Sequence, residues 1–84
     1  MRNPFAKAEV RWNAWNLDHC GKHGLEPRDV EYLIRNPGPQ YPKRMGNKYL
    51  VRGRLPAGRK VQVVFIKDDA PVLRVYPIHA MPLR

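Results

Sequence analysis

The hydrophobic pattern of the chain changes its period between residues 39 and 48. Before this segment, Val30, Leu33 and Ile34 recur at helical spacing, which places them on one face of a helix. After it, short runs rich in Val, Tyr, Phe and Ile are separated by Gly, Pro and Asp. Such runs are typical of strands joined by turns. The pattern therefore predicts a helical first half and a sheet-forming second half.

A short strand and a first helix are expected at the start of the chain. Residues 9–12 alternate polar and apolar positions, as a short strand does. Asn13 or Asn16 can cap a helix that runs to His23, because an asparagine side chain accepts a hydrogen bond from a free backbone N–H. Gly24 is suited to the end of that helix.

The second helix is expected to open at Glu26–Pro27, since proline is tolerated at the first helical position. The run Asn36–Pro39 stops it. Residues 1–7 precede every periodic segment and are expected to be frayed.

The second half predicts three strands and two turns. The strands are expected over residues 48–54, 60–66 and 72–78, with turns at 56–58 and 67–71. This spacing favours an antiparallel meander. The predicted fold class is α+β: two N-terminal helices packed on one face of a three- to four-stranded antiparallel sheet, in a single domain of residues 1–84. The opposite sheet face is expected to be open and to carry many of the arginines.

The charge of the chain is concentrated in the predicted sheet. The net charge is +9, and ten of the sixteen Lys and Arg residues lie at or after Lys43, with only Asp68 and Asp69 to offset them. Before Lys43, six basic residues face five acidic ones. A concentrated cationic surface attracts polyanions through counterion release and long-range steering. Composition therefore predicts a polyanionic partner.

The cysteine and histidine content argues against a disulfide or a metal site. Cys20 is the single cysteine, so no intrachain disulfide forms, which fits a reducing compartment. His19 and His23 share a helical face, but Cys20 is rotated off it and no third ligand is evident. No apolar stretch approaches the roughly 20 residues that span a bilayer. We expect no metal, no cofactor, no membrane association and a cytoplasmic location.

An ordered series of residues resembles the BrnT-like toxins. The series runs from residues 12–16 (WNAWN) and His19 through residues 22–25 (KHGL) to residues 29–31 (DVE). It continues with residues 44–51, 53–54, 58–59, 63–65 and 73–75, so the resemblance covers about residues 9–81.

The resemblance implies a ribonuclease toxin of a type II toxin–antitoxin pair, with a fold similar to that of RelE toxins. The implied activity is metal-independent RNA cleavage that inhibits translation. The implied partners are RNA and a cognate antitoxin protein, with DNA contacted only indirectly through the antitoxin. The family's last strand leads into a segment that presents an arginine to the site, and here that position falls on His79, with little or no helix expected beyond it.

His79 is the leading acid–base candidate, because a histidine titrates near neutrality and can move the protons of RNA cleavage. The alternative for His79 is a solvent-exposed ring at a strand end. Arg54 and Arg74 join it as catalytic candidates, since a guanidinium stabilises charge that develops on a phosphate. The candidates for binding RNA and its phosphates are Arg52, Arg59, Lys48 and Tyr76.

Each of these assignments has an alternative that involves no RNA chemistry. Arginines on an open sheet also serve solubility, and Tyr76 can equally pack against the core. Trp12 and Trp15 are expected in the core or in antitoxin contacts, and Cys20 is expected to be a small buried residue. The alternative function is a non-catalytic module that binds nucleic acid or protein and derives from the same fold.

Overall fold

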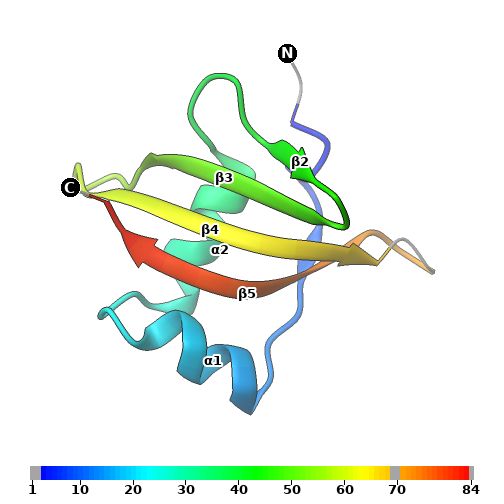
Figure 1. Cartoon of the computed structure of the whole chain (residues 1–84), viewed down its shortest axis with the longest axis horizontal. Coiled ribbons are helices and arrows are strands. Elements are labelled where there is room, and N and C mark those ends of the chain that lie inside the picture. Colours follow the sequence, from blue (N-terminus) through cyan, green and yellow to red (C-terminus); the bar gives the residue numbers. More distant parts are fainter. Residues whose placement is uncertain (1–2, 69–70, 84) are drawn as a thin grey trace.

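The computed structural model describes residues 3–68 and 71–83, which form an α+β domain around one hydrophobic core (Figure 1). The elements follow in the order β1 (Glu9–Val10), α1 (Ala14–Gly21), α2 (Pro27–Arg35), β2 (Lys43–Met45), β3 (Lys48–Arg54), β4 (Lys60–Asp68) and β5 (Arg74–Pro82). The α+β class and the order of two helices before the main strands are confirmed.

The sheet is larger and more mixed than the sequence predicted. Its five strands lie in the order β1-β5-β4-β3-β2, and β1 pairs parallel to β5 while the other pairs are antiparallel. The expectation of a three- to four-stranded antiparallel sheet is therefore wrong in both respects. Strand β2 escaped prediction because its three residues, Lys-Arg-Met, are all exposed and too few to show an alternating apolar pattern.

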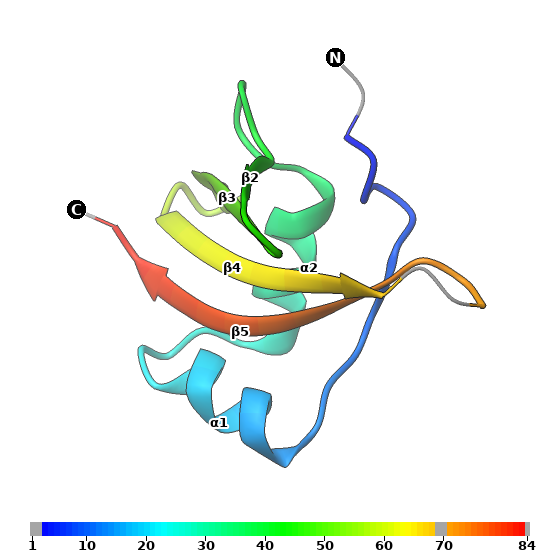
Figure 2. The same cartoon turned by 45° about the vertical axis from the view of Figure 1, so that its right-hand side comes forward.

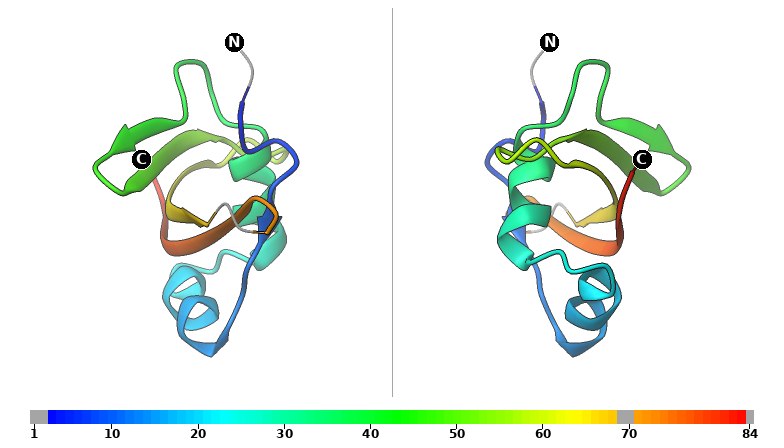
Figure 3. Two further views of the ribbon diagram at one scale, coloured as in Figure 1. Left: turned by 90° about the vertical axis from the view of Figure 1, so that its right-hand side faces the viewer. Right: turned by 90° about the vertical axis from the view of Figure 1, so that its left-hand side faces the viewer.

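The two helices occupy different places around the sheet. Helix α2 packs across β3 and β4, whereas α1 lies along β5. Figures 2 and 3 show the sheet curving around α2, with α1 below the edge formed by β5. The core side of the sheet contributes Val51, Val63, Phe65 and Val75, each at most 1% exposed. The other face of β3, β4 and β5 turns away from α2.

Residues 3–7 are packed rather than frayed. Phe5 is 2% exposed and makes edge contacts with the rings of Tyr49 and Phe65, at centroid distances of 4.9 and 5.0 Å. The Asn3 amide donates to the carbonyl of Ile34 at 2.8 Å, which satisfies a carbonyl at the end of α2. A single phenylalanine without periodic neighbours gave no sequence signal for this anchoring.

Both helix starts follow the predicted capping chemistry. Asn13 caps α1, and its side chain and that of Asn16 each accept from the other's backbone N–H. Helix α1 ends at Gly21 and not at His23, because the chain turns there through a bond from Gly24 N to Gly21 O and Gly24 adopts a φ of 78°. The predicted bounds of α2 are confirmed.

Strand β5 runs later than predicted, over Arg74–Pro82 instead of residues 72–78. Strand β5 contains Pro77, which the expected strand also included, and it ends at Pro82. Both prolines are tolerated because α1, and not another strand, borders the outer edge of β5 beyond Val75. A register shift at Val64/Phe65 leaves Ile78 without a partner on β4. This bulge keeps Tyr76 and His79 on the same face, three residues apart.

Candidate functional site

The face of the sheet turned away from α2 carries the candidate residues on parallel rows. Tyr76 stands opposite Ile66, whose partner on β3 is Lys48. His79 stands opposite Val64, in the middle of β4. Because side chains alternate along a strand, Arg52 shares this face, where its Nε donates to Gln62 at 2.8 Å. The predicted open and basic face is therefore present.

The three residues predicted to be catalytic do not converge on one point. Arg74 is opposite Asp68 at one end of β4, and Arg54 is opposite Lys60 at the other end. The eight residue-to-residue steps from Lys60 to Asp68 span roughly 26 Å at about 3.3 Å per step. His79 lies between these ends. A single phosphate beside His79 cannot contact both arginines.

Arg59 lies outside the open face. It belongs to the turn between β3 and β4, and its Nη2 donates to the backbone carbonyl of His23 at 3.0 Å. This bond ties the turn to the segment that follows α1. The assignment of Arg59 to RNA binding is therefore not favoured by its position.

Tyr76 is the centre of a cluster that joins α1 to β5. Its ring stacks on that of Trp15, with centroids 6.3 Å apart and planes 15° apart. Its hydroxyl lies 3.0 Å from the Asn13 amide nitrogen, and the Arg11 guanidinium carbon lies 5.4 Å from the ring centroid. Trp15 is 48% exposed and lies outside the core, so of its two expected places only an antitoxin contact stays a prediction. Trp12 does pack against the core, and its Nε1 donates to Glu31 at 2.8 Å.

His19 extends this ring stack along α1. Its ring lies on Trp15 at a centroid distance of 3.9 Å, and its Nδ1 lies 2.9 Å from the Trp15 carbonyl oxygen. Because a carbonyl only accepts, Nδ1 carries the proton in this bond and leaves Nε2 as the free nitrogen. We name the group Arg11, Asn13, Trp15, His19, Tyr76 and His79 the β5 surface.

The His79 ring is held by no side-chain hydrogen bond or ion pair to residues 3–68 and 71–83, and the residue is half-buried. Its neighbours across the sheet are aliphatic: Val64 on β4 and, beyond it, Leu50 on β3. An unattached imidazole on an accessible face can exchange protons with a bound ligand.

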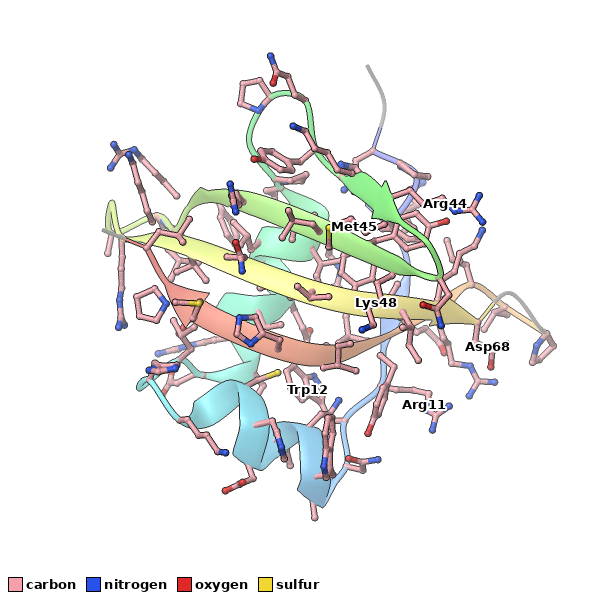
Figure 4. The ribbon with its side chains drawn as sticks, viewed as in Figure 1. Arg11, Trp12, Arg44, Met45, Lys48 and Asp68 are labelled. Atoms are coloured by element: carbon pink, nitrogen blue, oxygen red, sulfur yellow. The ribbon has the colours of Figure 1, made fainter. Side chains whose placement is uncertain are left out.

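A hollow of about 250 Å³ opens next to Tyr76. Arg11, Arg74 and Asp68 line it, and Figure 4 shows Arg11 and Asp68 at the same end of the sheet. Among residues 3–68 and 71–83, the Nε of Arg74 has no hydrogen-bond partner; this atom is buried and lies 3.9 Å from a carboxylate oxygen of Glu9. A buried, unsatisfied N–H is costly, so this atom favours an acceptor in the hollow.

Asp68 was expected to be a turn residue, but it is the last residue of β4. Its position brings one carboxylate to the hollow. Asp69, the second predicted turn acid, lies outside the described residues.

Cys20 is a buried thiol, as expected, at 2% exposure. Burial raises the pKa of this thiol to about 11, so the group stays protonated near neutral pH. The part of the chain that the structure describes holds no group of three or more His, Cys, Asp or Glu side chains arranged for a metal ion. Within residues 3–68 and 71–83, neither helix has the length and apolar character needed to cross a bilayer.

Arg11, Asn13 and the exposed ring of Trp15 were missed as site residues. One signal for Trp15 was available, because Trp15 and His19 are four residues apart and therefore neighbours on a helix. No sequence signal pointed to Arg11, whose place depends on the parallel pairing of β1 with β5.

Comparisons with protein-family models, with curated proteins and with solved structures found no match.

Proposed function

We propose that this protein is an endoribonuclease toxin of a type II toxin–antitoxin system, with a BrnT-like, RelE-related fold. The proposal rests on the ordered series of residues that resembles BrnT-like toxins. The structural observation that supports the proposal is the β5 surface. There the His79 imidazole lies on the same basic sheet face as the ring of Tyr76. Its site of action is then the cytoplasm, where RNA is its substrate.

The β5 surface offers the groups that binding of single-stranded RNA requires. Exposed aromatic rings stack on bases whatever the sequence, and Trp15 offers such a ring beside Tyr76. Arg11 and Arg74 bring guanidinium groups to the adjoining hollow, where a phosphate oxygen would give Arg74 Nε the acceptor it lacks. Lys48 stands on the same row as Tyr76 and adds a cation across the face.

The proposed reaction is internal transesterification. His79 takes the proton of a ribose 2′-hydroxyl, and the 2′-oxygen forms a bond to the adjacent phosphorus. The bond from phosphorus to the 5′-oxygen breaks, and the imidazolium returns its proton to that oxygen. The products are a 2′,3′-cyclic phosphate and a 5′-hydroxyl. Cations of the face stabilise the charge that builds on the phosphate oxygens.

The test is cleavage of a labelled single-stranded RNA in the presence of EDTA by the wild type, His79→Ala and His23→Ala. His23 is an exposed histidine beyond α1, so its loss provides the matched control. We expect cyclic-phosphate ends from the wild type and the control. We expect a rate lower by about 10²–10⁴-fold for His79→Ala, the usual contribution of an acid–base group. Absence of cleavage under conditions where RNA is bound refutes the proposed ribonuclease activity. Equal cleavage rates for all three proteins refute the role of His79.

A non-catalytic binding module is the second candidate, and an apolar strip on the open face favours it. Met45 is 46% exposed, and Leu50, Val64 and Ile66 are only half-buried. An apolar strip rimmed by lysines and arginines fits a protein partner that brings apolar side chains together with carboxylates. In the toxin proposal this partner is the antitoxin, whose carboxylates would block RNA.

Co-purification with the product of an adjacent acidic open reading frame tests the partner. A stable complex is expected to melt at a higher temperature than the free chain, because a ligand that binds only the folded state stabilises it. The variant Met45→Glu places a charge in the apolar strip and should weaken the complex. Equal binding by wild type and Met45→Glu would show that the partner binds a surface other than this strip.

A further inference from the structure

A second groove lies at the end of the sheet far from Arg74. Its volume is about 580 Å³, within the range of small-molecule sites. The loop of residues 36–39 forms one wall together with Tyr41, and Arg52, Arg54 and Lys60 line the side made by β3 and β4. The groove shares no residue with the β5 surface, and by strand register His79, opposite Val64, is four residues or roughly 13 Å along β4 from Lys60.

Three cations meet in this groove without a carboxylate. Arg54 and Lys60 are direct cross-strand partners, and like charges in such positions repel each other. No ion pair within the described ranges 3–68 and 71–83 involves Arg52, Arg54 or Lys60, and no Asp or Glu lines the groove. The free chain therefore keeps an unfavourable charge arrangement that a bound anion would relieve.

Two of these cations are already oriented. Arg52 Nε donates to Gln62 at 2.8 Å, and Arg54 Nη1 donates to the carbonyl of Gly58 at 3.0 Å. A guanidinium has five N–H donors, so most donors of both side chains remain available. Guanidinium groups held in place by such bonds lose little further freedom when they bind two phosphate oxygens.

The opposite wall is apolar and closely packed against β3. Pro37, Pro39 and Tyr41 contribute its apolar surface. Leu83 lies beside Lys60, whose carbonyl accepts from Leu83 N at 2.8 Å. The loop is fixed against β3 by a bond from Gly38 N to Arg52 O at 2.8 Å. A flat ring fits between this wall and the cations. Proline and tyrosine side chains offer flat surfaces for stacking, and stacking does not require a hydrogen bond to each polar atom of the ring.

We propose that this groove binds a nucleotide, with its phosphate on Arg52, Arg54 and Lys60 and its base against the wall of Pro37, Pro39 and Tyr41. The proposal does not rest on RNA cleavage, because the groove shares no residue with the β5 surface. The nucleotide can be a free monophosphate or one unit of an RNA chain, and the chemistry of recognition is the same.

The test is a nuclear magnetic resonance titration of the full chain with AMP, adenosine, inorganic phosphate and a short single-stranded RNA, each separately. AMP is expected to shift the amide signals of residues 36–41 and 52–54 and to bind at least tenfold more tightly than phosphate or adenosine. The RNA titration distinguishes the two sources of the nucleotide. Tighter binding of RNA than of AMP at these same amides identifies an RNA chain as the ligand, and tighter binding of AMP identifies a free nucleotide. Both results support the proposal.

The matched variants are Arg54→Gln/Lys60→Gln and, as control, Lys7→Gln/Lys22→Gln, which removes the same charge from exposed positions elsewhere. The first variant should lose at least tenfold in AMP affinity and keep or raise its melting temperature, since a repulsive pair is gone. The control should bind like the wild type. Equal AMP affinity of the two variants, shifts confined to other segments, or phosphate binding as tight as AMP binding overturns the proposal.

Discussion

The ring of Trp15 on α1 lies nearly parallel to the ring of Tyr76 on β5, at a centroid distance of 6.3 Å. This contact joins the helix to the outer strand through side chains that remain accessible. Trp15 is about half exposed, and Tyr76 is further fixed by the Asn13 amide at its hydroxyl. Because the exposed part of the stack is not needed for the core, we infer that it is available to a base.

Trp15→Ala is expected to weaken binding of a single-stranded RNA by about 5- to 150-fold, since base–aromatic stacking contributes about 1–3 kcal/mol. The loss of unfolding free energy should be about 1–3 kcal/mol, because two partly exposed ring contacts, with Tyr76 and with His19, are removed. Fluorescence anisotropy with labelled RNA and thermal melting measure the two effects. Leu17→Ala provides the control, as Leu17 is 45% exposed on the same helix and outside the stack. Equal loss of affinity in both variants contradicts the role of Trp15.

Gly53→Ala is expected to destabilise the fold by about 1–3 kcal/mol, the usual cost of overpacking. A Cβ at this position would stand 2.9 Å from Gly38 N and 3.0 Å from Leu33 Cδ1, so the loop of residues 36–39 or α2 must move. Denaturant unfolding measures the change.

The control for Gly53 is Gly21→Ala, where a Cβ meets nothing within 4 Å. Alanine there should be neutral or stabilise by a few tenths of a kcal/mol, because it restricts the unfolded chain and favours helix. A Gly53→Ala protein as stable as the control would mean that the loop is not held tightly against β3.

Local sequence signals were sufficient for α2 and β3, whose bounds were predicted correctly. Proline at the helix start and a proline-rich stop define α2 through backbone chemistry alone. Such signals failed where a neighbour decides the structure. Strand β5 runs on to Pro82 because β4 pairs with it as far as Val61, and three exposed residues form β2 because β3 offers them a partner.

The candidate site was predictable only in part for the same reason. The open face and the shared side of Arg52 and Arg54 follow from strand alternation, which is a local property. The separation of Arg54 from Arg74 follows from strand register, which the sequence does not define. Arg59 stands apart from the open face, since it belongs to the turn between β3 and β4 and its Nη2 donates to the backbone carbonyl of His23, so its role in RNA binding stays a prediction.

Asn16→Ala is expected to cost about 2–4 kcal/mol of unfolding free energy. Asn16 is fully buried, its Oδ1 accepts from Asn13 N at 2.7 Å, and its Nδ2 donates to Arg11 O at 2.9 Å. Alanine leaves both backbone groups without these partners, and each unsatisfied buried group costs about 1–3 kcal/mol. Urea unfolding followed by tryptophan fluorescence measures the loss.

Asn36→Ala is the matched control for Asn16. Its side chain donates to Tyr32 O at 3.1 Å, but this carbonyl also accepts from Asn36 N at 2.8 Å, and the residue is exposed. Its loss should cost less than about 1 kcal/mol. Similar costs for the two variants would show that Asn16 contributes only a surface cap.

Cys20 is expected to make the stability of the protein depend on alkaline pH. Its pKa is about 11 in the folded state, against an ordinary value of 9.0, because burial disfavours the thiolate. The unfolded chain therefore loses this proton first as pH rises, and unfolding is favoured progressively from about pH 9 to about pH 11. Below pH 9 this contribution to stability is fully present.

The variant Cys20→Ala isolates this effect from the lysines and tyrosines that titrate in the same range. At neutral pH the variant should be less stable than the wild type, because a buried sulfur is replaced by a smaller methyl group and leaves a cavity. That difference in unfolding free energy should shrink as the pH is raised from about 9 to about 11, because only the wild type loses stability through the thiol. Denaturant unfolding of both proteins at intervals across this range measures it. A difference that stays constant with pH would mean that the Cys20 thiol ionises as readily in the folded protein as in the unfolded chain.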